Sequence, residues 1–486
     1  MIDRLNQHVA SPLGELIALP WTTGTLPHGV VNDDLMHPNY WVKNEQRPLG
    51  PVPAMRIGVV FSGGPAPGGH DVIVGLLRHL RSGDEVIGFC NGFGGLLRSE
   101  YRAILPTDAH ALTGLGGFDF LGTDRTKLSS DAHFETAKQV IQNLKLSALV
   151  VVGGDDSNTN ALFLAKALHG VCQVIGVPKT IDGDLAYPPY LTVTFGFHTA
   201  TQHYADLVSM LAIDARATRK YVHVVKLMGR SASHVALEVA RQVAPNGCVL
   251  AEEIAEKKWG LMDVLDYFSG VIMNRLAVNK PYGVLIFPEG MLEAIPEFKS
   301  FLNGDSQPLH RVFDRIGVPL MGLPGVVLDA HGNPNMSLIR SEELLVSAIT
   351  AVLTNTHNCQ NNVQLLGHFF GYTGRAAAPT PFDSAYSQLL GKTAYESALM
   401  GLSGVLVGCD FSTNGPVPLA LPLVGMVHFD SHRERYVIQK YMVDTQGEDY
   451  QSYLHQKQQW VLNDATIPRP NSSKWPKQLQ LKKTGA

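Results

Sequence analysis

Residues 56–82 read RIGVVFSGGPAPGGHDVIVGLLRHLRS. The β-branched run at the start predicts a buried strand, and the apolar residues of 71–82 recur at helical spacing. Between them, residues 62–69 hold four glycines in eight positions, so the backbone can approach a ligand closely there. The stretch predicts a strand-loop-helix unit whose loop suits a phosphate at the helix N-terminus, although a plain tight turn has the same composition.

The same pattern returns along the chain and predicts the fold class. Residues 147–168 form a second strand-loop-helix unit, 171–184 a strand ending in a polar turn, and 220–243 and 281–298 two further units. Strands that alternate with helices predict an α/β protein with mostly parallel sheets covered by helices on both faces. Ligands bind such sheets beyond the carboxyl ends of the strands, where the polar loops gather.

Composition narrows the classes of function. The chain has 486 residues, 45% hydrophobic content and a formal net charge of -4, which argues against a nucleic-acid partner bound through a general basic field. Five well-separated cysteines include no CxxC pair, which fits a reducing compartment. The sequence shows no secretory signal and no apolar stretch long enough for a membrane span, so we expect a cytoplasmic protein with no membrane partner.

The loop at 153–159, GGDDSNT, places two adjacent carboxylates after a strand. Carboxylates repel a bare phosphate, but Mg²⁺ is bound by one or two carboxylates together with phosphate oxygens and waters. The pattern therefore indicates a metal-bound phosphate near Asp155 and Asp156. Capping of the following helix by Asp156, Ser157 or Asn158 is the alternative reading.

The loop at 178–184, PKTIDGD, combines a lysine, a hydroxyl and two carboxylates. Transfer of a phosphoryl group to an alcohol needs a proton acceptor, and a positioned aspartate serves, while a lysine offsets charge on the transferring group. The sequence favours phosphoryl transfer with Lys179, Asp182 and Asp184 at its centre. An acidic surface turn would look the same in isolation.

Seven motifs in order resemble the phosphofructokinase family, specifically its pyrophosphate-dependent branch. The resemblance spans about Arg56 to Val427, and its motifs are SGGPAPGG (62–69), GGDDSNT (153–159), PKTIDGD (178–184), TFGFHTA (194–200), KLMGRSASH (226–234), FPEG (287–290) and GYTGR (371–375). It implies two Rossmann-like lobes with the active site in the cleft between them. We expect a donor lobe at 54–195 plus about 355–430, a sugar-phosphate lobe at 196–354, and extensions at 1–53 and 431–486.

The resemblance also implies the residues that handle the donor. Gly64 would contact pyrophosphate through its backbone, Asp155 would hold Mg²⁺, and Asp182 would take the proton from the C1 hydroxyl of the sugar. The family pattern also places Arg125 and Lys127 near the transferring phosphate. Three further residues would surround the base Asp182: Thr180, Ile181 and Asp184.

A second group of residues would bind the sugar phosphate, fructose 6-phosphate in the family. Met228, Gly229 and Arg230 match the phosphate-contacting motif, and Glu289 should bind sugar hydroxyls. The resemblance adds Tyr372 and Arg375 to this group as residues that would hold the substrate. Lys220 and Tyr221 match positions that reach into the site of the neighbouring subunit, which implies a homodimer.

Donor choice rests on Asp156 and Lys179, because ATP-using relatives generally have glycine at both positions. Asp156 would intrude on the site of an ATP α-phosphate, and Lys179 would supply charge to pyrophosphate in the transition state. An ATP-dependent kinase is therefore disfavoured. With phosphate as the leaving group, the reaction is expected to be readily reversible.

Some features stay open. His198 stands where the family often has an acid, and we interpret it as a structural histidine; His368 is given no catalytic role. The sugar-contacting motifs do not fix chain length, so sedoheptulose 7-phosphate is an alternative substrate. A non-catalytic regulatory subunit is the alternative from another class, although the presence of Asp155, Lys179 and Asp182 speaks against it.

Overall fold

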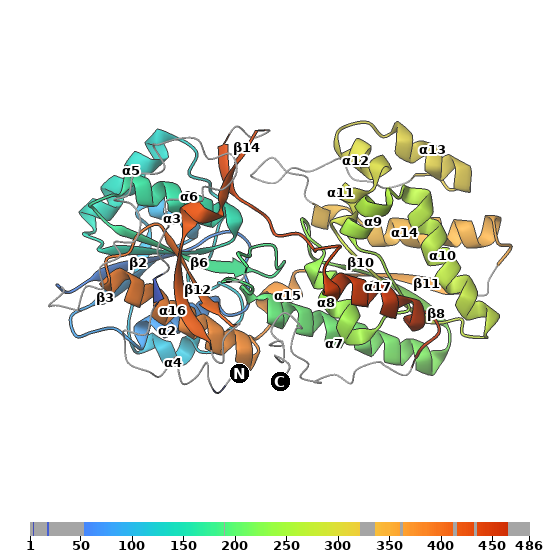
Figure 1. The fold of residues 1–486 in the computed structure, drawn as a ribbon, viewed down its shortest axis with the longest axis horizontal. Coiled ribbons are helices and arrows are strands. Elements are labelled where there is room, and N and C mark those ends of the chain that lie inside the picture. The colour runs from blue at the N-terminus through green and yellow to red at the C-terminus, as the bar shows by residue number, and fades with distance from the viewer. Residues whose placement is uncertain are drawn as a thin grey trace.

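The computed structural model describes residues 53–464 except 189, 321–335, 360–362, 412–415 and 432–434, together with Asp3 and the backbone of Ile17–Ala18. Two α/β lobes lie side by side (Figure 1). Helix α15, Thr373–Ala376, lies where the lobes meet, and helix α7, Phe197–Thr218, runs from there along the second lobe. This arrangement confirms the predicted fold class.

The first lobe is built on a mixed, mainly parallel sheet. Its strands are β1 Ile17–Ala18, β2 Arg56–Phe61, β3 Glu85–Phe89, β4 Tyr101–Ile104, β5 Ala148–Gly153, β6 Gln173–Thr180, β7 Phe195–Gly196, β12 Val405–Asp410 and β13 Val417–Pro422. Their order is β1-β13-β12-β6-β5-β2-β3-β4, and β7 pairs with β6. The central strands β3, β2, β5, β6 and β12 are parallel, so the loops after β2, β5 and β6 leave the same edge of the sheet.

Helices cover both faces of this sheet. They are α2 Gly69–Leu77, α3 Gly92–Arg98, α4 Asp108–Leu112, α5 Asp131–Asn143, α6 Asp155–Ala167 and α16 Pro381–Leu399. Strand β5 shows how the sequence achieves this, because every residue of the strand is buried. Val150 and Val152 belong to the core with α2 and α16, whereas Leu149 and Val151 belong to the core with α3, α5 and α6.

The second lobe has a parallel sheet in the order β11-β8-β10-β9. Its strands are β8 Tyr221–Leu227, β9 Gly247–Cys248, β10 Gly283–Pro288 and β11 Gln364–Phe370. Its further helices are α8 His234–Val243, α9 Ala251–Lys257, α10 Leu261–Ala277, α11 Met291–Ala294, α12 Pro296–Leu302, α13 Gln307–Ile316, η3 Met336–Leu338 and α14 Ser341–Asn355. Helices α7 and α8 share one core with this sheet, and α10 and α14 share the other.

One predicted boundary is wrong. The sequence analysis assigns residues from about 355 onward to the first lobe, but β11 pairs along its whole length with β8 of the second sheet. The chain returns to the first lobe only at α16, which packs on α2. The apolar run of β11 predicts a strand without specifying which sheet it joins.

Residues 435–464 do not form a peripheral extension, in contrast to the expectation of an extension at 431–486. Helix η4, Leu423–Met426, leads into the antiparallel pair β14, Val427–Asp430, and β15, Arg435–Ile438. This pair lies on the first lobe, and the chain then runs to helix α17, Glu448–Trp460, on the second lobe (Figure 1). We call residues 435–464 the crossing segment. Residues 465–486 lie outside the described residues, as do most of residues 1–53.

Candidate active site

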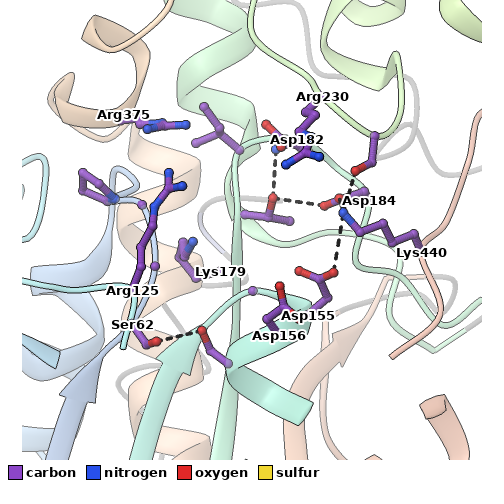
Figure 2. A pocket seen from close by; sticks show the side chains of 18 of the residues that line it. Ser62, Arg125, Asp155, Asp156, Lys179, Asp182, Asp184, Arg230, Arg375 and Lys440 are labelled. Atoms are coloured by element: carbon purple, nitrogen blue, oxygen red, sulfur yellow. Dashed lines mark hydrogen bonds and ion pairs between the residues drawn. The ribbon is translucent and has the colours of Figure 1, made fainter. Parts of the chain in front are cut away.

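A cavity of about 200 Å³ lies between the lobes, with polar side chains on most of its wall (Figure 2). The first lobe contributes the loops after β2, β5 and β6, as the parallel sheet requires. The second lobe contributes the loops after β8 and β10 and residues near α14 and α15. The cleft predicted between two lobes is therefore present, and it joins segments that are far apart in the sequence.

The glycine-rich loop forms one wall. Gly63 has a φ of 85°, a conformation that favours glycine, and its N–H donates to Asp124 O at 2.9 Å. A Cβ at Gly63 would lie 3.5 Å from Lys179 Nζ, and one at Gly64 would lie 3.4 Å from the Arg375 guanidinium. The loop thus brings bare backbone between two cationic groups, which is an environment suited to phosphate oxygens.

Asp155 and Asp156 begin helix α6, where the helix dipole favours negative charge. Asp155 Oδ2 lies 3.6 Å from Lys440 Nζ, and Asp156 Oδ1 lies 3.8 Å from Arg435 Nη2. Both carboxylates line the cavity and are partly exposed to it. The N-cap residue of the helix is Gly154, and both carboxylates face a cation of the crossing segment.

The turn after β6 is held by the hydroxyl of Thr180. It accepts a hydrogen bond from Asp182 N at 3.0 Å and donates to Asp184 Oδ1 at 3.2 Å (Figure 2). Gly183 has a φ of 72°, and a Cβ there would lie 3.0 Å from the Phe197 ring. One threonine and one glycine thus fix the two aspartates in different directions.

Asp182 is partly exposed to the cavity and lies in a strongly charged environment. Burial in the surrounding protein raises its pKa, and the charge of Glu289 raises it further, while Arg375, Lys440 and Lys179 oppose the shift. A carboxylate with a raised pKa is a better proton acceptor than an ordinary aspartate. This environment therefore suits Asp182 to accepting a proton.

Lys179 is 8% exposed and points toward the glycine-rich loop. Burial lowers its pKa to about 8, and Arg375 lowers it further, against the charges of Asp182, Asp155 and Asp184. Its ammonium group is therefore still mostly charged at neutral pH. Burial also raises the pKa of Asp184 to about 6, and Lys440 partly offsets this effect.

Second-lobe side chains face these groups across the cavity. Arg230 donates from Nε and Nη2 to Glu293 Oε1 at 3.2 and 3.1 Å, which fixes its guanidinium at the edge of the cavity. Glu289 is 5% exposed and accepts a hydrogen bond from Ser337 Oγ at 2.9 Å. Burial raises the pKa of Glu289, and that bond opposes the shift.

The structure brings together most of the predicted site residues. Those that line the cavity are Gly64, Arg125, Asp155, Asp156, Lys179, Thr180, Ile181, Asp182, Asp184, Arg230, Glu289 and Arg375. They come from both lobes and from all the motifs that the sequence analysis singled out, apart from TFGFHTA.

Six predicted residues lie outside the cavity lining: Lys127, Lys220, Tyr221, Met228, Gly229 and Tyr372. Met228 is fully buried and Gly229 accepts a backbone hydrogen bond from Gly290, so both support the loop that carries Arg230. Tyr372 is 53% exposed, with the Arg375 guanidinium 5.3 Å from its ring centroid. Lys220 and Tyr221 stand at the amino end of β8, opposite to the end at the cavity.

Sequence reasoning missed Lys440 of the crossing segment, which lines the cavity and contacts Asp155 and Asp184. It also missed Ser231 and Ser337. Ser231 directly follows Arg230 in KLMGRSASH, so its place in this motif could have predicted it as a site residue. The sequence around Lys440 offers no comparable pattern.

His198 and His368, the two histidines noted in the sequence, contact other residues of the fold and lie outside the cavity lining. His198 Nδ1 lies 2.8 Å from Thr380 Oγ1, and burial lowers its pKa to about 4. His368 Nε2 lies 2.8 Å from His223 Nδ1 of the neighbouring strand. Neither histidine lines the cavity, in agreement with the interpretation of His198 as structural.

Comparison with known proteins decides the family. Residues 56–398 match the phosphofructokinase family. The chain belongs to the phosphofructokinase family. The family assignment covers both lobes and every motif that carried the resemblance.

Several relatives of this phosphofructokinase chain share a name. The pyrophosphate--fructose 6-phosphate 1-phosphotransferase of Treponema pallidum is 35% identical over 470 residues, covering 87% of this chain and 82% of the relative. The enzyme of that name from Porphyromonas gingivalis is 34% identical over 453 residues, covering 85% and 82%. The subunit beta of the enzyme from Solanum tuberosum is 35% identical over 449 residues, covering 85% and 78%.

Solved phosphofructokinases share the fold. The pyrophosphate-dependent phosphofructokinase of Marinobacter aquaeolei superposes with a TM-score of 0.55 at 16% identity, covering 85% of this chain and 95% of that chain. The T-state phosphofructokinase of Pichia pastoris gives a TM-score of 0.56 at 17% identity, covering 78% and 38%. Among the described residues, no helix of this chain is long and apolar enough to cross a bilayer.

Proposed function

We propose that the chain transfers a phosphoryl group from pyrophosphate to the C1 hydroxyl of fructose 6-phosphate, reversibly, giving fructose 1,6-bisphosphate and phosphate. The observation that carries this proposal is the convergence of Asp155, Lys179 and Asp182 on one cavity, opposite Arg230 and Glu289 of the other lobe. Relatives at 34–35% identity bear the name of this activity.

In this mechanism Asp182 removes the proton from the C1 hydroxyl as the oxygen attacks the terminal phosphorus of pyrophosphate. The bond from that phosphorus to the bridging oxygen breaks, and phosphate leaves. Lys179 and Arg375, on either side of the glycine-rich loop, offset the charge that spreads over the transferring group. Arg230 and Glu289 orient the sugar phosphate from the second lobe.

Mg²⁺ is the proposed cofactor, and the acids of the cavity fit it. Among the described residues, no group of three or more His, Cys, Asp or Glu side chains is arranged to hold a metal ion by itself. A site of one or two carboxylates completed by phosphate oxygens and water is what Mg²⁺ commonly uses. Asp155 would hold the ion with Asp156 beside it, and the bound ion would supply charge stabilisation to the pyrophosphate.

Donor selection is proposed to lie with Asp156 and Lys179. The carboxylate of Asp156 lines the cavity and would repel an additional phosphate of a nucleotide. Lys179 is buried beside both glycine loops, since a Cβ at Gly63 or Gly154 would lie 3.5 or 3.9 Å from its Nζ. Its charge would therefore act on the donor rather than on the sugar.

A purified-enzyme assay tests the function. Pyrophosphate and ATP are each offered with Mg²⁺ against fructose 6-phosphate and sedoheptulose 7-phosphate, and phosphate release and product are measured. The proposal expects the highest kcat/KM with pyrophosphate and fructose 6-phosphate. A higher kcat/KM with sedoheptulose 7-phosphate or with ATP would overturn the substrate or donor assignment, and no turnover with any pair would indicate a non-catalytic subunit.

The double variant Asp156→Gly, Lys179→Gly tests the donor assignment. Without Lys179 the transition state loses a buried positive charge, so kcat with pyrophosphate should fall by about 100-fold or more. Fructose 6-phosphate binding, measured by calorimetry, serves as the control and should change little, because the second lobe is untouched. Unchanged pyrophosphate turnover in the double variant would contradict the assignment.

We further propose a cytoplasmic homodimer. All five cysteines lie among the described residues and are free thiols, which is consistent with a reducing compartment. Lys220 and Tyr221 lie far from this chain's own cavity along β8, so the role that the family resemblance implies for them requires a second subunit.

A further inference from the structure

Lys440 connects the lobes inside the cavity. Its Nζ lies 3.6 Å from Asp155 Oδ2 and 3.4 Å from Asp184 Oδ2, both of the first lobe, and it donates to Ser231 Oγ of the second lobe at 2.5 Å. In Figure 2 the side chain enters from the right, and its ammonium group lies between Asp184 and Asp155. The ammonium group thus makes one hydrogen bond to the second lobe and two ion pairs to the first lobe.

The backbone on both sides of Lys440 is anchored. Before it, Ile438 N donates to Thr159 Oγ1 of helix α6 at 3.1 Å. After it, Tyr441 N donates to Asp184 O at 2.8 Å, and Tyr441 O accepts from His234 Nε2 at 2.9 Å. The position of Lys440 is therefore determined from the first lobe and from the second lobe at the same time.

Farther along, the crossing segment is fixed to the second lobe by buried contacts. Val443 N donates to Glu252 Oε1 at 3.2 Å, and Lys457 Nζ of α17 lies 2.7 Å from both carboxylate oxygens of Glu253. Glu253 is fully buried and Lys457 is 7% exposed. An anchor of this kind specifies one placement of the segment, since a shift would leave a buried charge without its partner.

The charge around Lys440 explains why a cation is needed there. Asp155, Asp156, Asp182 and Asp184 all line the cavity, and like charges gathered around one cavity repel. Burial opposes the charge on Lys440, but these four carboxylates together raise its pKa above the ordinary value.

We propose that Lys440 is a positioning residue of the phosphoryl-transfer site, supplied by the crossing segment. Its ammonium group holds Asp155 and Asp184 at a fixed separation and ties both to Ser231 of the opposite lobe. It acts through these side chains and not on the substrates, because its ammonium group lies against three side chains of the protein. This inference rests on the proposed function of the site. Lys440 would keep the loops of that site in fixed positions relative to one another.

Four proteins test the proposal: the parent, Lys440→Met, Lys440→Arg and Gln439→Met. Lys440→Met keeps the aliphatic stem and removes the charge, and Lys440→Arg restores a charge. Gln439→Met is the matched control, because Gln439 is the exposed neighbour in the same segment and does not line the cavity. Steady-state kinetics give kcat and KM, and calorimetry with fructose 6-phosphate alone reports the second-lobe site without turnover.

We expect Lys440→Met to lower kcat by about 30-fold or more, because misplacing catalytic groups by about 1 Å costs on this order. The Kd for fructose 6-phosphate should stay within about threefold of the parent value, since the polar partners of Lys440 described above are Asp155, Asp184 and Ser231. Lys440→Arg should recover most of kcat, and Gln439→Met should match the parent.

Two results would overturn the proposal. One is a kcat for Lys440→Met within about threefold of the parent value. The other is a parallel loss of kcat and of fructose 6-phosphate binding, which would mean that the substitution disrupts the whole cleft. An error in the proposed donor would instead appear in the parent protein, as turnover with ATP rather than with pyrophosphate. The kcat ratios between the Lys440 variants and the parent are therefore measured with whichever donor the parent uses.

Discussion

Lys179 is a buried ammonium group whose charge sets an upper pH limit on the proposed reaction. Burial lowers its pKa to about 8, so the charged form is lost from the substrate-free enzyme as pH rises through that value. We predict that kcat/KM for pyrophosphate falls about tenfold per pH unit above this point, measured as a pH–rate profile between about pH 6 and 10.

The variant Lys179→Arg is the control for this pH limit, because a guanidinium stays charged at every pH in that range. The kcat/KM of this variant should be lower than that of the parent, because the larger arginine side chain fits the site less well. The alkaline limb of its pH–rate profile should nevertheless move above about pH 10. If the alkaline limb of Lys179→Arg coincided with that of the parent, the ionisation would belong to another group.

At the scale of a single element, the turn that follows β6 depends on Gly183. Alanine there would be held at a φ of 72° and would place its Cβ 3.0 Å from Phe197 and 3.1 Å from His234. The left-handed conformation alone costs about 1–2 kcal/mol for a residue with a Cβ. We predict that Gly183→Ala lowers stability by more than this and reduces kcat about tenfold or more, because Asp182 and Asp184 flank the glycine.

Gly170 offers a matched control, because it has the same φ of 72° and a Cβ added there would meet no atom within 4 Å. Gly170→Ala should lower the free energy of unfolding by about 1–2 kcal/mol and leave kcat unchanged. The comparison uses denaturant unfolding and steady-state kinetics on both variants. Equal effects of the two substitutions on kcat would contradict a specific role for the turn.

The elements also show what the sequence can predict about the site. The expectation that the loops after β2, β5 and β6 meet is confirmed, because parallel neighbouring strands deliver their carboxyl ends to one edge. Nothing in the run Gln364–Phe370 distinguishes one parallel sheet from another, so the sequence does not reveal the lobe to which β11 belongs. Lys440 escapes sequence reasoning for a related reason: its partners are determined by tertiary contacts of α17 and β15, and its own neighbours form no motif.

At the scale of the whole molecule, the proposed homodimer would share its active sites. The cavity of one chain contains Asp182, whereas Lys220 of the same chain lies at the opposite end of β8. If Lys220 completes the site of the partner, Asp182→Asn and Lys220→Ala both affect the same site of a mixed dimer and leave the other site intact. The Asp182→Asn chain carries both defects at its site, and the Lys220→Ala chain carries neither, because its partner supplies an intact lysine.

We therefore predict complementation when the two variants are co-expressed. Each homodimer should be impaired, Asp182→Asn by about 100-fold or more through loss of the proton acceptor. Random pairing of equal amounts makes half of the dimers mixed, each with one intact site of two, so about a quarter of the parent activity should return. The measurement is kcat per total subunit for the co-expressed protein and for each variant alone. Activity that equals the average of the two separate variants would show that Lys220 serves its own chain or no site at all.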